Sequence, residues 1–262
     1  MARVTTNYFQ RHRMKIVKEV LGRIFALWAA IVFVGSLLVV FIPIWLTGIW
    51  PEPKRTIYVF SVFNVWMKFF FVFSGVRRII KGREHFKKGE NYVVVCNHNS
   101  FMDVPLSSPG IPGPNKTIAK AEMAKIPLFG MIYRRGSVLV DRKSEESRRN
   151  SFSKMKAVLD LGLHMCIYPE GTRNKTSEPL QRFHDGAFKL AAETKKQIIP
   201  ALIFYTTKVL PRKTFFFWPH RVEMHFLPAV PVENKTAQQL KEEVFVIMKN
   251  YVVSKKSIDS KT

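Results

Sequence analysis

The chain of 262 residues contains only two cysteines, Cys96 and Cys166, and they lie far apart in the sequence. They form neither a disulfide framework nor a C-x-x-C metal pair, which is typical of a protein in a reducing compartment, and both suit small buried positions. The seven histidines are scattered without the spacing of a metal site, and no glycine-rich nucleotide loop, internal repeat or low-complexity segment is present. We therefore expect no metal and no cofactor.

Acidic residues are also scarce. Nineteen Asp and Glu stand against 42 Lys and Arg, so the formal net charge is +23. An excess of this size favours an anionic partner, which is nucleic acid, an acidic membrane surface or a phosphorylated substrate. The charge says nothing about the fold, and only the distribution of the apolar residues separates these partners.

Charge is missing altogether from residues 24–50. This run exceeds the roughly 20 residues that cross a bilayer core, and it is too long for the core of a signal peptide. A second apolar run, residues 57–75, is rich in Phe and Trp but is interrupted by Asn64 and Lys68, so it suits an interfacial helix as well as a spanning one. We predict a membrane-embedded helical hairpin that either spans the bilayer or enters one leaflet. This hairpin and the lack of a nucleic-acid-binding signature argue against nucleic acid as a partner.

Basic residues flank both apolar runs. By the positive-inside rule, both flanks belong on the cytoplasmic side. We therefore expect a protein of the inner, cytoplasmic membrane, with its larger part docked on an anionic membrane surface from the cytoplasmic side. The flanking residues are Arg3, Arg11, Arg13, Lys15, Lys18 and Arg23 before the first run, and Arg77, Arg78, Lys81 and Arg83 after the second.

A later aromatic segment, residues 214–221 with the sequence TFFFWPHR, lies beside further cations, Arg212, Lys213 and Arg221. Aromatic and cationic side chains together favour a second contact with the membrane interface. An aromatic strand packed in the core explains the same pattern equally well.

From residue 91 onward, short β-rich runs alternate with amphipathic helices. Strands are expected at residues 92–97, 116–121, 136–142, 164–168, 197–205 and 221–230, and helices at 146–162, 184–196 and 236–253. This alternation predicts an α/β fold with a largely parallel sheet flanked by helices. Pro200 argues that its strand is an edge strand or carries a bulge. The chain then divides into a basic N-terminus with the hairpin, residues 1–83, and an α/β domain, residues 84–262.

The first of these strands delivers a histidine to its carboxyl end, where ligands bind in parallel sheets: Asn97 and His98 follow it, and Asp103 comes five residues later. Histidine titrates near neutral pH, and an aspartate bonded to one ring nitrogen leaves the other nitrogen free to act as a base. We expect a helix to begin here with Asn99 or Ser100 as N-cap, so that Asp103 reaches back to the imidazole. His98 is then the predicted general base and Asp103 its orienting partner. Taken alone, a surface histidine beside a capping aspartate accounts for the same spacing.

A second strand, residues 164–168, ends in a turn with the sequence YPEGTRN, residues 168–174. The backbone N–H groups of a turn beside an arginine, here Arg173, make a suitable cradle for phosphate. Arg142 and Lys120 lie at or near the ends of two further strands. Taken singly, each of these cations is explained by a solvated position on the surface. Taken together, they could hold a phosphate-bearing nucleophile near a histidine base.

In their order, these blocks resemble the glycerolipid acyltransferases, most closely the 1-acyl-sn-glycerol-3-phosphate (lysophosphatidic acid) acyltransferases. The resemblance covers residues 92–202. The family blocks are N-H-x-x-x-x-D, a strand closed by arginine, [FY]-P-E-G-T-R, and an apolar run with a proline. Here they are met by Asn97, His98 and Asp103, by residues 136–142, by residues 168–173, and by the run around Pro200, with the IPLFG run at 126–130 before the second block.

The resemblance implies an enzyme that moves a fatty acyl group from an acyl thioester, on coenzyme A or acyl carrier protein, to the sn-2 hydroxyl of lysophosphatidic acid. The product is phosphatidic acid, the reaction belongs to phospholipid synthesis, and the thioester is a substrate rather than a cofactor. His98 would be the base and Asp103 its orienter. By the same resemblance Arg173, Arg142 and Lys120 hold the acceptor phosphate, and Glu170, Gly171 and Thr172 shape the turn. His184 and Asp185 stand where family members often carry more lysine.

The acceptor remains open at this point. Glycerol 3-phosphate, another lysophospholipid and the lysolipid precursor of an aminolipid suit the same blocks. A protein of another class, a non-catalytic lipid-binding membrane protein, would share the hairpin, although the intact pair of His98 and Asp103 argues against it. The carrier of the acyl group and the preferred chain length are not predicted.

Overall fold

A computed structural model describes residues 2–212 and 214–259, with side chains from residue 12 onward. Lys213 and the side chains of Arg3 and Arg11, all counted among the basic residues above, lie outside this description. The strands form a seven-stranded sheet in the order β1-β7-β6-β2-β5-β3-β4. They are β1 Arg78–Lys81, β2 Val93–Cys96, β3 Asn115–Lys120, β4 Ser137–Val140, β5 His164–Ile167, β6 Ile198–Phe204 and β7 Val222–Phe226.

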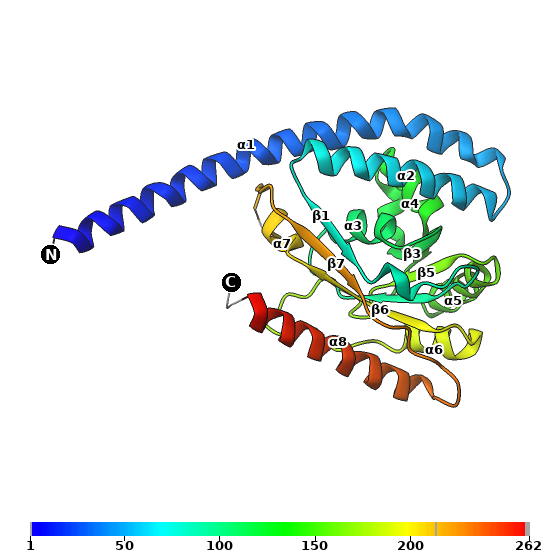
Figure 1. Cartoon of the computed structure of the whole chain (residues 1–262). Coiled ribbons are helices and arrows are strands. Elements are labelled where there is room, and N and C mark those ends of the chain that lie inside the picture. Colours follow the sequence, from blue (N-terminus) through cyan, green and yellow to red (C-terminus); the bar gives the residue numbers. More distant parts are fainter. Residues whose placement is uncertain (1, 213, 260–262) are drawn as a thin grey trace.

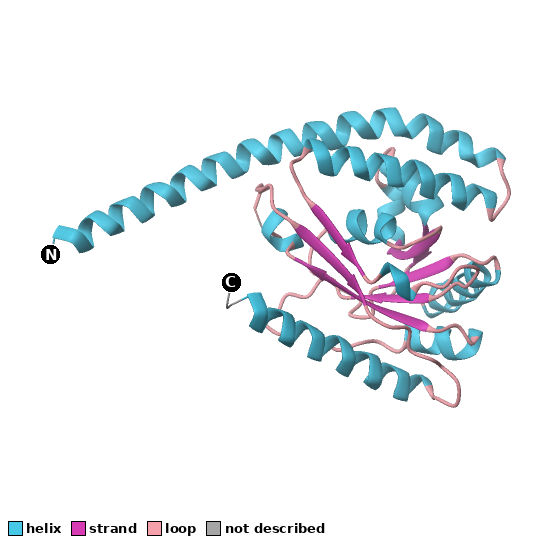
Figure 2. Cartoon of the chain, viewed as in Figure 1, coloured by secondary structure: helices cyan, strands magenta, loops and turns pink. Residues whose placement is uncertain are grey.

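The sheet is largely parallel and lies between helices on both faces, as predicted (Figure 1, Figure 2). Strands β6, β2, β5, β3 and β4 run parallel, whereas β7 is antiparallel to β6 and parallel to the edge strand β1. β1 contains residues that the sequence assigned to the N-terminal segment, so the sheet begins before residue 84. The helices are α1 Ala2–Leu46, α2 Lys54–Phe73, α3 Asp103–Gly110, α4 Phe129–Gly136, α5 Glu145–Asp160, α6 Gly186–Thr194, α7 Thr206–Val209 and α8 Ala237–Asp259.

β2 explains why the sheet needs two helical layers. All four of its residues are completely buried, and their side chains alternate between two apolar clusters. Val94 and Cys96 face the cluster that includes residues of α1 to α4, and Val93 and Val95 face the cluster that includes residues of α5, α6 and α8. A strand covered on both faces reads as a continuous apolar run rather than an alternating one.

The N-terminal helices form the predicted hairpin, and its tip is bound to the α/β domain. α1 and α2 pack against each other above the sheet (Figure 1). Near the tip, Lys116 Nζ of β3 lies 2.9 Å from Glu52 Oε1, and the Arg135 guanidinium donates to Thr47 Oγ1 over 2.9 Å. The part of the hairpin in which α1 and α2 pair therefore lies along the domain, whereas the N-terminal half of α1 extends past it (Figure 1).

The two helices bury one side and expose the other. On α2, Trp66 and Phe70 are buried, whereas Val65 and Phe69 are exposed. His12–Ile49 and Lys54–Phe73 are each long and apolar enough to cross a bilayer by length and composition, and only a minority of each apolar window is buried inside the protein. These two segments are therefore candidate membrane spans.

The aromatic segment at residues 214–221 packs on α1 and is not a core strand. Phe217 N donates to Gly22 O over 3.0 Å, and the Trp218 ring meets Phe25 edge-on at 5.7 Å. The Phe216 ring occupies the place that a side chain at residue 22 would need, so a larger residue there would force this ring to move. Phe215 remains 64% exposed, whereas Phe217 is buried in the apolar cluster that includes residues of α1 and α2.

The prediction that Pro200 marks an edge strand is wrong, because β6 lies between β2 and β7. The alternative, an irregularity in pairing, is found on the partner strand. Pro200 O accepts from Leu227 N, and Ile198 pairs with Val230, so three residues on one strand lie opposite two on the other. The missing N–H of Pro200 faces this interruption, where the ladder needs no donor.

His164 of β5 gives the fold a measurable sensitivity to acid. It is 6% exposed, its Nδ1 accepts from Tyr92 N over 3.2 Å, and its Nε2–H donates to Pro112 O over 3.1 Å. Burial lowers the pKa of His164 to about 4. The unfolded chain titrates near 6.5, so between these values only the unfolded state binds the proton, and stability falls as the pH falls.

We expect this one group to remove about 3 kcal/mol from the free energy of unfolding between pH 6.5 and pH 4. His164→Asn keeps an acceptor for Tyr92 N and does not titrate. Denaturant unfolding in detergent, followed by near-UV circular dichroism across this range, should give a steeper acid loss for the wild type than for the variant. Equal slopes would contradict a neutral buried histidine.

Candidate active site

Asn97 fixes the loop that follows β2. Its side-chain amide donates to Ile203 O over 3.0 Å, and its Oδ1 accepts from Ile203 N over 2.6 Å. The side chain thus continues the pairing with β6 beyond the last residue of β2. His98 consequently stands at the carboxyl edge of the sheet, in the position that the sequence predicts.

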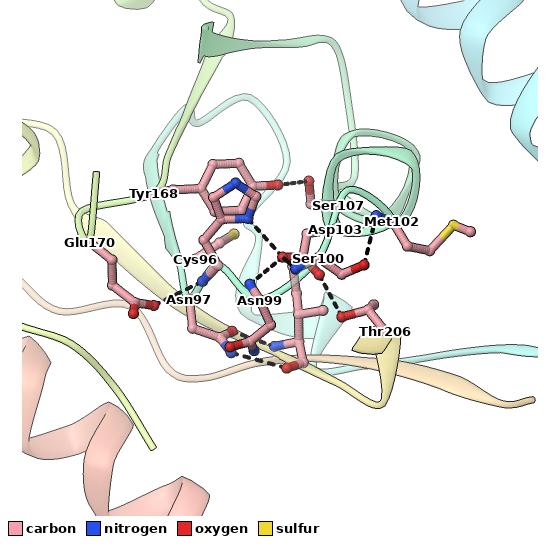
Figure 3. A network of polar contacts seen from close by, with 12 residues as sticks. Cys96, Asn97, Asn99, Ser100, Met102, Asp103, Ser107, Tyr168, Glu170 and Thr206 are labelled. Atoms are coloured by element: carbon pink, nitrogen blue, oxygen red, sulfur yellow. Dashed lines mark hydrogen bonds and ion pairs between the residues drawn. The ribbon is translucent and has the colours of Figure 1, made fainter. Parts of the chain in front are cut away.

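His98 and Asp103 are in direct contact. His98 Nδ1 lies 2.7 Å from Asp103 Oδ2, and the aspartate side chain is fully buried while the histidine is 20% exposed. Asp103 Oδ2 also accepts from the backbone N–H groups of Asn99 and Ser100, and its Oδ1 accepts from Thr206 Oγ1 over 2.6 Å (Figure 3). Four donors therefore surround one buried carboxylate.

The helix starts later than the prediction places it. α3 begins at Asp103 itself, and no side chain caps its first turn. Ser100 caps the turn that leads into α3, because its Oγ accepts from Met102 N over 3.3 Å and its own N–H donates to Asp103 Oδ2. Asn99 also donates its backbone N–H to Asp103 Oδ2. The Ser100 hydroxyl donates to Leu210 O over 2.9 Å. The loop from His98 to Asp103 therefore wraps around the carboxylate and leaves little freedom to the histidine.

This arrangement determines which ring nitrogen of His98 is available. A carboxylate offers acceptors only, so His98 Nδ1 donates its proton to Asp103 Oδ2. Nε2 then carries the free lone pair and can accept a proton. The ring of Tyr168 lies beside the imidazole, with centroids 4.4 Å apart and planes at 31°. The pair of His98 and Asp103 therefore has the geometry of an oriented general base.

Tyr168 supports the imidazole rather than titrating beside it. Its hydroxyl lies 2.7 Å from Ser107 Oγ of α3. Burial raises the pKa of Tyr168 well above its usual value, so the side chain stays protonated. Its ring is a fixed apolar wall against one side of His98.

The turn after β5 grips the backbone of His98. Glu170 is 3% exposed, and its Oε1 accepts from His98 N over 2.9 Å while its Oε2 accepts from Gln181 N over 3.0 Å. On the other side, Asn174 N donates to His98 O over 2.7 Å. Burial raises the pKa of the Glu170 carboxyl, and the two backbone N–H groups oppose this rise. His98 is thus fixed through both its backbone and its side chain.

Gly171 allows this turn to form. Its φ of +70° is unfavourable for other residues, and an added Cβ would lie 2.9 Å from the His184 ring. Arg142 at the end of β4 donates to Gly171 O. His184 and Arg142 therefore pack on the turn, which explains why a histidine is tolerated at residue 184.

The predicted phosphate-binding cations all lie at the carboxyl edge of the sheet, with different surroundings. The Arg142 guanidinium is engaged with the turn, and the Arg173 guanidinium lies 3.7 Å from the centre of the Phe101 ring. Lys120 stands exposed at the end of β3, and Thr172 is exposed on the turn. Their binding of phosphate stays a prediction.

An apolar cavity of about 640 Å³ lies next to this site, beneath the hairpin. α1 to α4 and the loop at residues 210–217 line it. Phe101 and Met102 line its end near His98, and Asn115 and Thr117 line it where β3 begins, at the amino edge of the sheet. The cavity therefore extends from the candidate site toward the opposite edge of the sheet, and its wall is mostly apolar.

The chain is similar to known acyltransferases. Residues 77–204 match the family model described as Acyltransferase. The 1-acyl-sn-glycerol-3-phosphate acyltransferase alpha of Homo sapiens is 30% identical over 164 residues, which are 62% of this chain and 58% of that protein. The 1-acyl-sn-glycerol-3-phosphate acyltransferase of Borreliella burgdorferi is 27% identical over 183 residues, 70% of this chain and 72% of that protein. The chain spans somewhat more than half the length of its mammalian relatives.

A solved structure shares the fold. The crystal structure of the 1-acyl-sn-glycerophosphate (LPA) acyltransferase PlsC from Thermotoga maritima matches with a TM-score of 0.73 and 23% identity, over 92% of this chain and 97% of that one. The sheet and the N-terminal helical hairpin therefore have the fold of that protein. Residues 77–204 match an acyltransferase domain, and the chain is similar to the 1-acylglycerol-3-phosphate acyltransferases.

The sequence did not single out Thr206, Phe101 or the ring of Tyr168. The signal that identified His98, a polar residue just after the carboxyl end of a strand, also applies to Thr206. This residue follows β6, which lies next to β2 in the sheet. Phe101 lies within the N-H-x-x-x-x-D block, but its contact with Arg173 joins residues 72 positions apart in the chain. Only the folded structure brings these two side chains together.

We expect Thr206→Val to lower kcat by about 5- to 10-fold, because Asp103 Oδ1 then loses its donor inside the protein. Thr206→Ser keeps the hydroxyl and should restore most of the turnover. Thr207→Val is the matched control, since its side chain is exposed next door. Steady-state kinetics of all three variants test the expectation, and equal kcat for Thr206→Val and the wild type would contradict it.

Proposed function

We propose that this protein transfers a fatty acyl group from an acyl thioester to the sn-2 hydroxyl of lysophosphatidic acid and forms phosphatidic acid. The observation that carries this proposal is the contact of 2.7 Å between His98 Nδ1 and the buried Asp103. It leaves His98 Nε2 as a base, and Phe101 and Met102 of the same loop line an apolar cavity. The names of the curated relatives support the choice of acceptor.

The proposed reaction needs no covalent intermediate on the protein. His98 Nε2 accepts the proton of the acceptor hydroxyl while its oxygen forms a bond to the thioester carbonyl carbon. The carbon–sulfur bond then breaks, and the thiolate takes the proton back from the imidazolium, which Asp103 stabilises in the meantime. Cys96 is a poor nucleophile, because it is buried and burial raises the pKa of its thiol well above the usual value.

The apolar cavity suits the fatty acyl chain. Its wall of aromatic and aliphatic side chains offers dispersion contacts and few polar groups, and Phe101 and Met102 place one end near His98. A chain that enters there would bring its thioester to the edge of the sheet. The acceptor phosphate would then lie among Arg173, Arg142 and Lys120, with Arg142 acting mainly through the turn that it holds.

The hairpin would enter one leaflet instead of spanning the bilayer. Its tip is bound to Lys116 and Arg135 of the α/β domain, and a tip on the far side of a membrane could not make these contacts. The exposed apolar side of α1 and α2 then faces lipid, and the basic residues on both flanks favour the anionic cytoplasmic leaflet. The substrates, both amphipathic, would reach the cavity from that leaflet.

Thiol release by the detergent-purified protein tests the proposal. Acyl-coenzyme A is the donor, and lysophosphatidic acid, glycerol 3-phosphate and lysophosphatidylcholine are the acceptors. Release that requires lysophosphatidic acid supports the proposed acceptor. Release with glycerol 3-phosphate alone would replace it, and release only with acyl carrier protein thioesters would change the donor. No release with either donor would favour a non-catalytic lipid-binding protein.

A further inference from the structure

Phe101 occupies an unusual place for a large apolar side chain. It is 59% exposed, although it lies in the loop between His98 and Asp103 and lines the mouth of the cavity. One side of its ring carries the Arg173 guanidinium, whose central carbon lies 3.7 Å from the ring centroid. Arginine stacks well on aromatic rings, and this separation is well within the range of cation–π attraction.

Both partners of this contact are fixed relative to the base. The backbone next to Phe101 is held by the bonds from Asn99 N and Ser100 N to Asp103. Arg173 lies in the turn where Glu170 accepts from His98 N, and the next residue donates to His98 O. These bonds fix the backbone of Arg173 but not its long side chain. The guanidinium keeps a fixed position relative to the imidazole only if a further contact holds the side chain.

Phe101 is the group that holds it. Among the described side chains, residues 12–212 and 214–259, no carboxylate forms an ion pair with Arg173. An aromatic ring attracts a cation without neutralising it, whereas a carboxylate would compete with an incoming phosphate. The guanidinium is thus positioned and still has its N–H donors for an anionic ligand.

We propose that Phe101 is a positioning residue, whose ring holds the Arg173 guanidinium beside the cavity mouth, in the place where the acceptor phosphate binds. This inference rests on the proposed function. It assigns to Phe101 a part in the preference for a phosphate-bearing acceptor. Loss of the ring should weaken acceptor binding and leave the chemistry at His98 largely unchanged.

The test is steady-state kinetics of the full-length protein with lysophosphatidic acid as the varied acceptor. We expect Phe101→Leu to raise the acceptor KM by about 3- to 10-fold with kcat within about 2-fold of the wild type, because one cation–π contact is lost. Phe101→Trp keeps an aromatic face and should stay near the wild-type KM. Phe152→Leu is the matched control, since Phe152 carries Lys156 at 5.2 Å on α5, on the other face of the sheet.

A double-mutant cycle separates positioning from a plain apolar contact. If Phe101 acts through the guanidinium, Phe101→Leu has no further effect on the acceptor KM once Arg173→Ala is present. An equal increase in both backgrounds would overturn the inference, because Phe101 would then contact the acceptor by itself. Thermal unfolding midpoints near that of the wild type exclude a general loss of structure.

The outcomes also separate this inference from the function beneath it. If Arg173→Ala raises the acceptor KM and Phe101→Leu does not, the positioning role is wrong and the proposed function stands. If Arg173→Ala leaves the acceptor KM unchanged, the phosphate-binding role of Arg173 fails and the inference fails with it. Absence of acyl transfer by the wild type would remove the proposed function itself.

Discussion

His98→Ala should lower kcat by about 10³- to 10⁴-fold and leave the acceptor KM nearly unchanged. The imidazole is the base in the proposed reaction, and general base catalysis contributes on this scale. Without the imidazole, the acceptor hydroxyl must lose its proton to water. The Tyr168 ring and the described residues that line the nearby apolar cavity offer no other base. Binding of the phosphate and of the acyl chain depends on other groups, so KM should change little.

Thiol release measured under saturating donor and acceptor gives the necessary kcat. His85→Ala is a suitable control, because His85 lies in the short helix at residues 83–85, outside the site. Retention of more than a tenth of wild-type turnover by His98→Ala would remove His98 from the role of base. The same preparation should keep the unfolding midpoint of the wild type, since His98 is partly exposed and its backbone contacts do not depend on the side chain.

The sequence predicted much of the sheet because its strands and helices have clear periodic patterns. Residues 92–97 read as a strand and form β2, and the helix expected at 146–162 is α5, Glu145–Asp160. The pairing of His98 with Asp103 was accessible for the same reason, since both residues belong to one loop. A contact between two residues of one loop, at the end of a strand, can be predicted from the local sequence alone.

Features that depend on distant partners were not predictable in this way. Ser100 caps the turn before α3 as expected, but the contact with Thr206, which donates to the Asp103 carboxylate from 103 residues away, is not visible in the local sequence. Pro200 lies in an inner strand, although proline is expected in edge strands. The inner position is possible because an extra residue on the partner strand, near Leu227, interrupts the pairing opposite Pro200. The binding of the hairpin tip to Lys116 joins residues 64 positions apart, and periodicity carries no information about it.

Glu170→Ala is expected to have the second largest effect. This carboxylate accepts the backbone N–H groups of His98 and Gln181 at a site that is almost completely buried. Its removal leaves two buried donors without partners, which costs about 2–4 kcal/mol in the free energy of unfolding. It also frees the backbone of His98, so we expect kcat to fall by about 10- to 100-fold.

Glu170→Gln separates the two consequences. The amide keeps the size of the side chain and one acceptor oxygen, but its NH₂ group faces the second backbone donor. Both the loss of stability and the loss of turnover should then be intermediate. Glu178→Ala is the control within the same loop, because the Glu178 side chain is exposed and the residue bonds through its backbone, whose N–H donates to Thr176 Oγ1 and whose oxygen accepts from Asn174. Denaturant unfolding and thiol release on the same samples measure both quantities. If Glu170→Ala lost stability but kept its kcat, the carboxylate would support the fold alone, and the position of His98 would depend on Asp103 and Asn174.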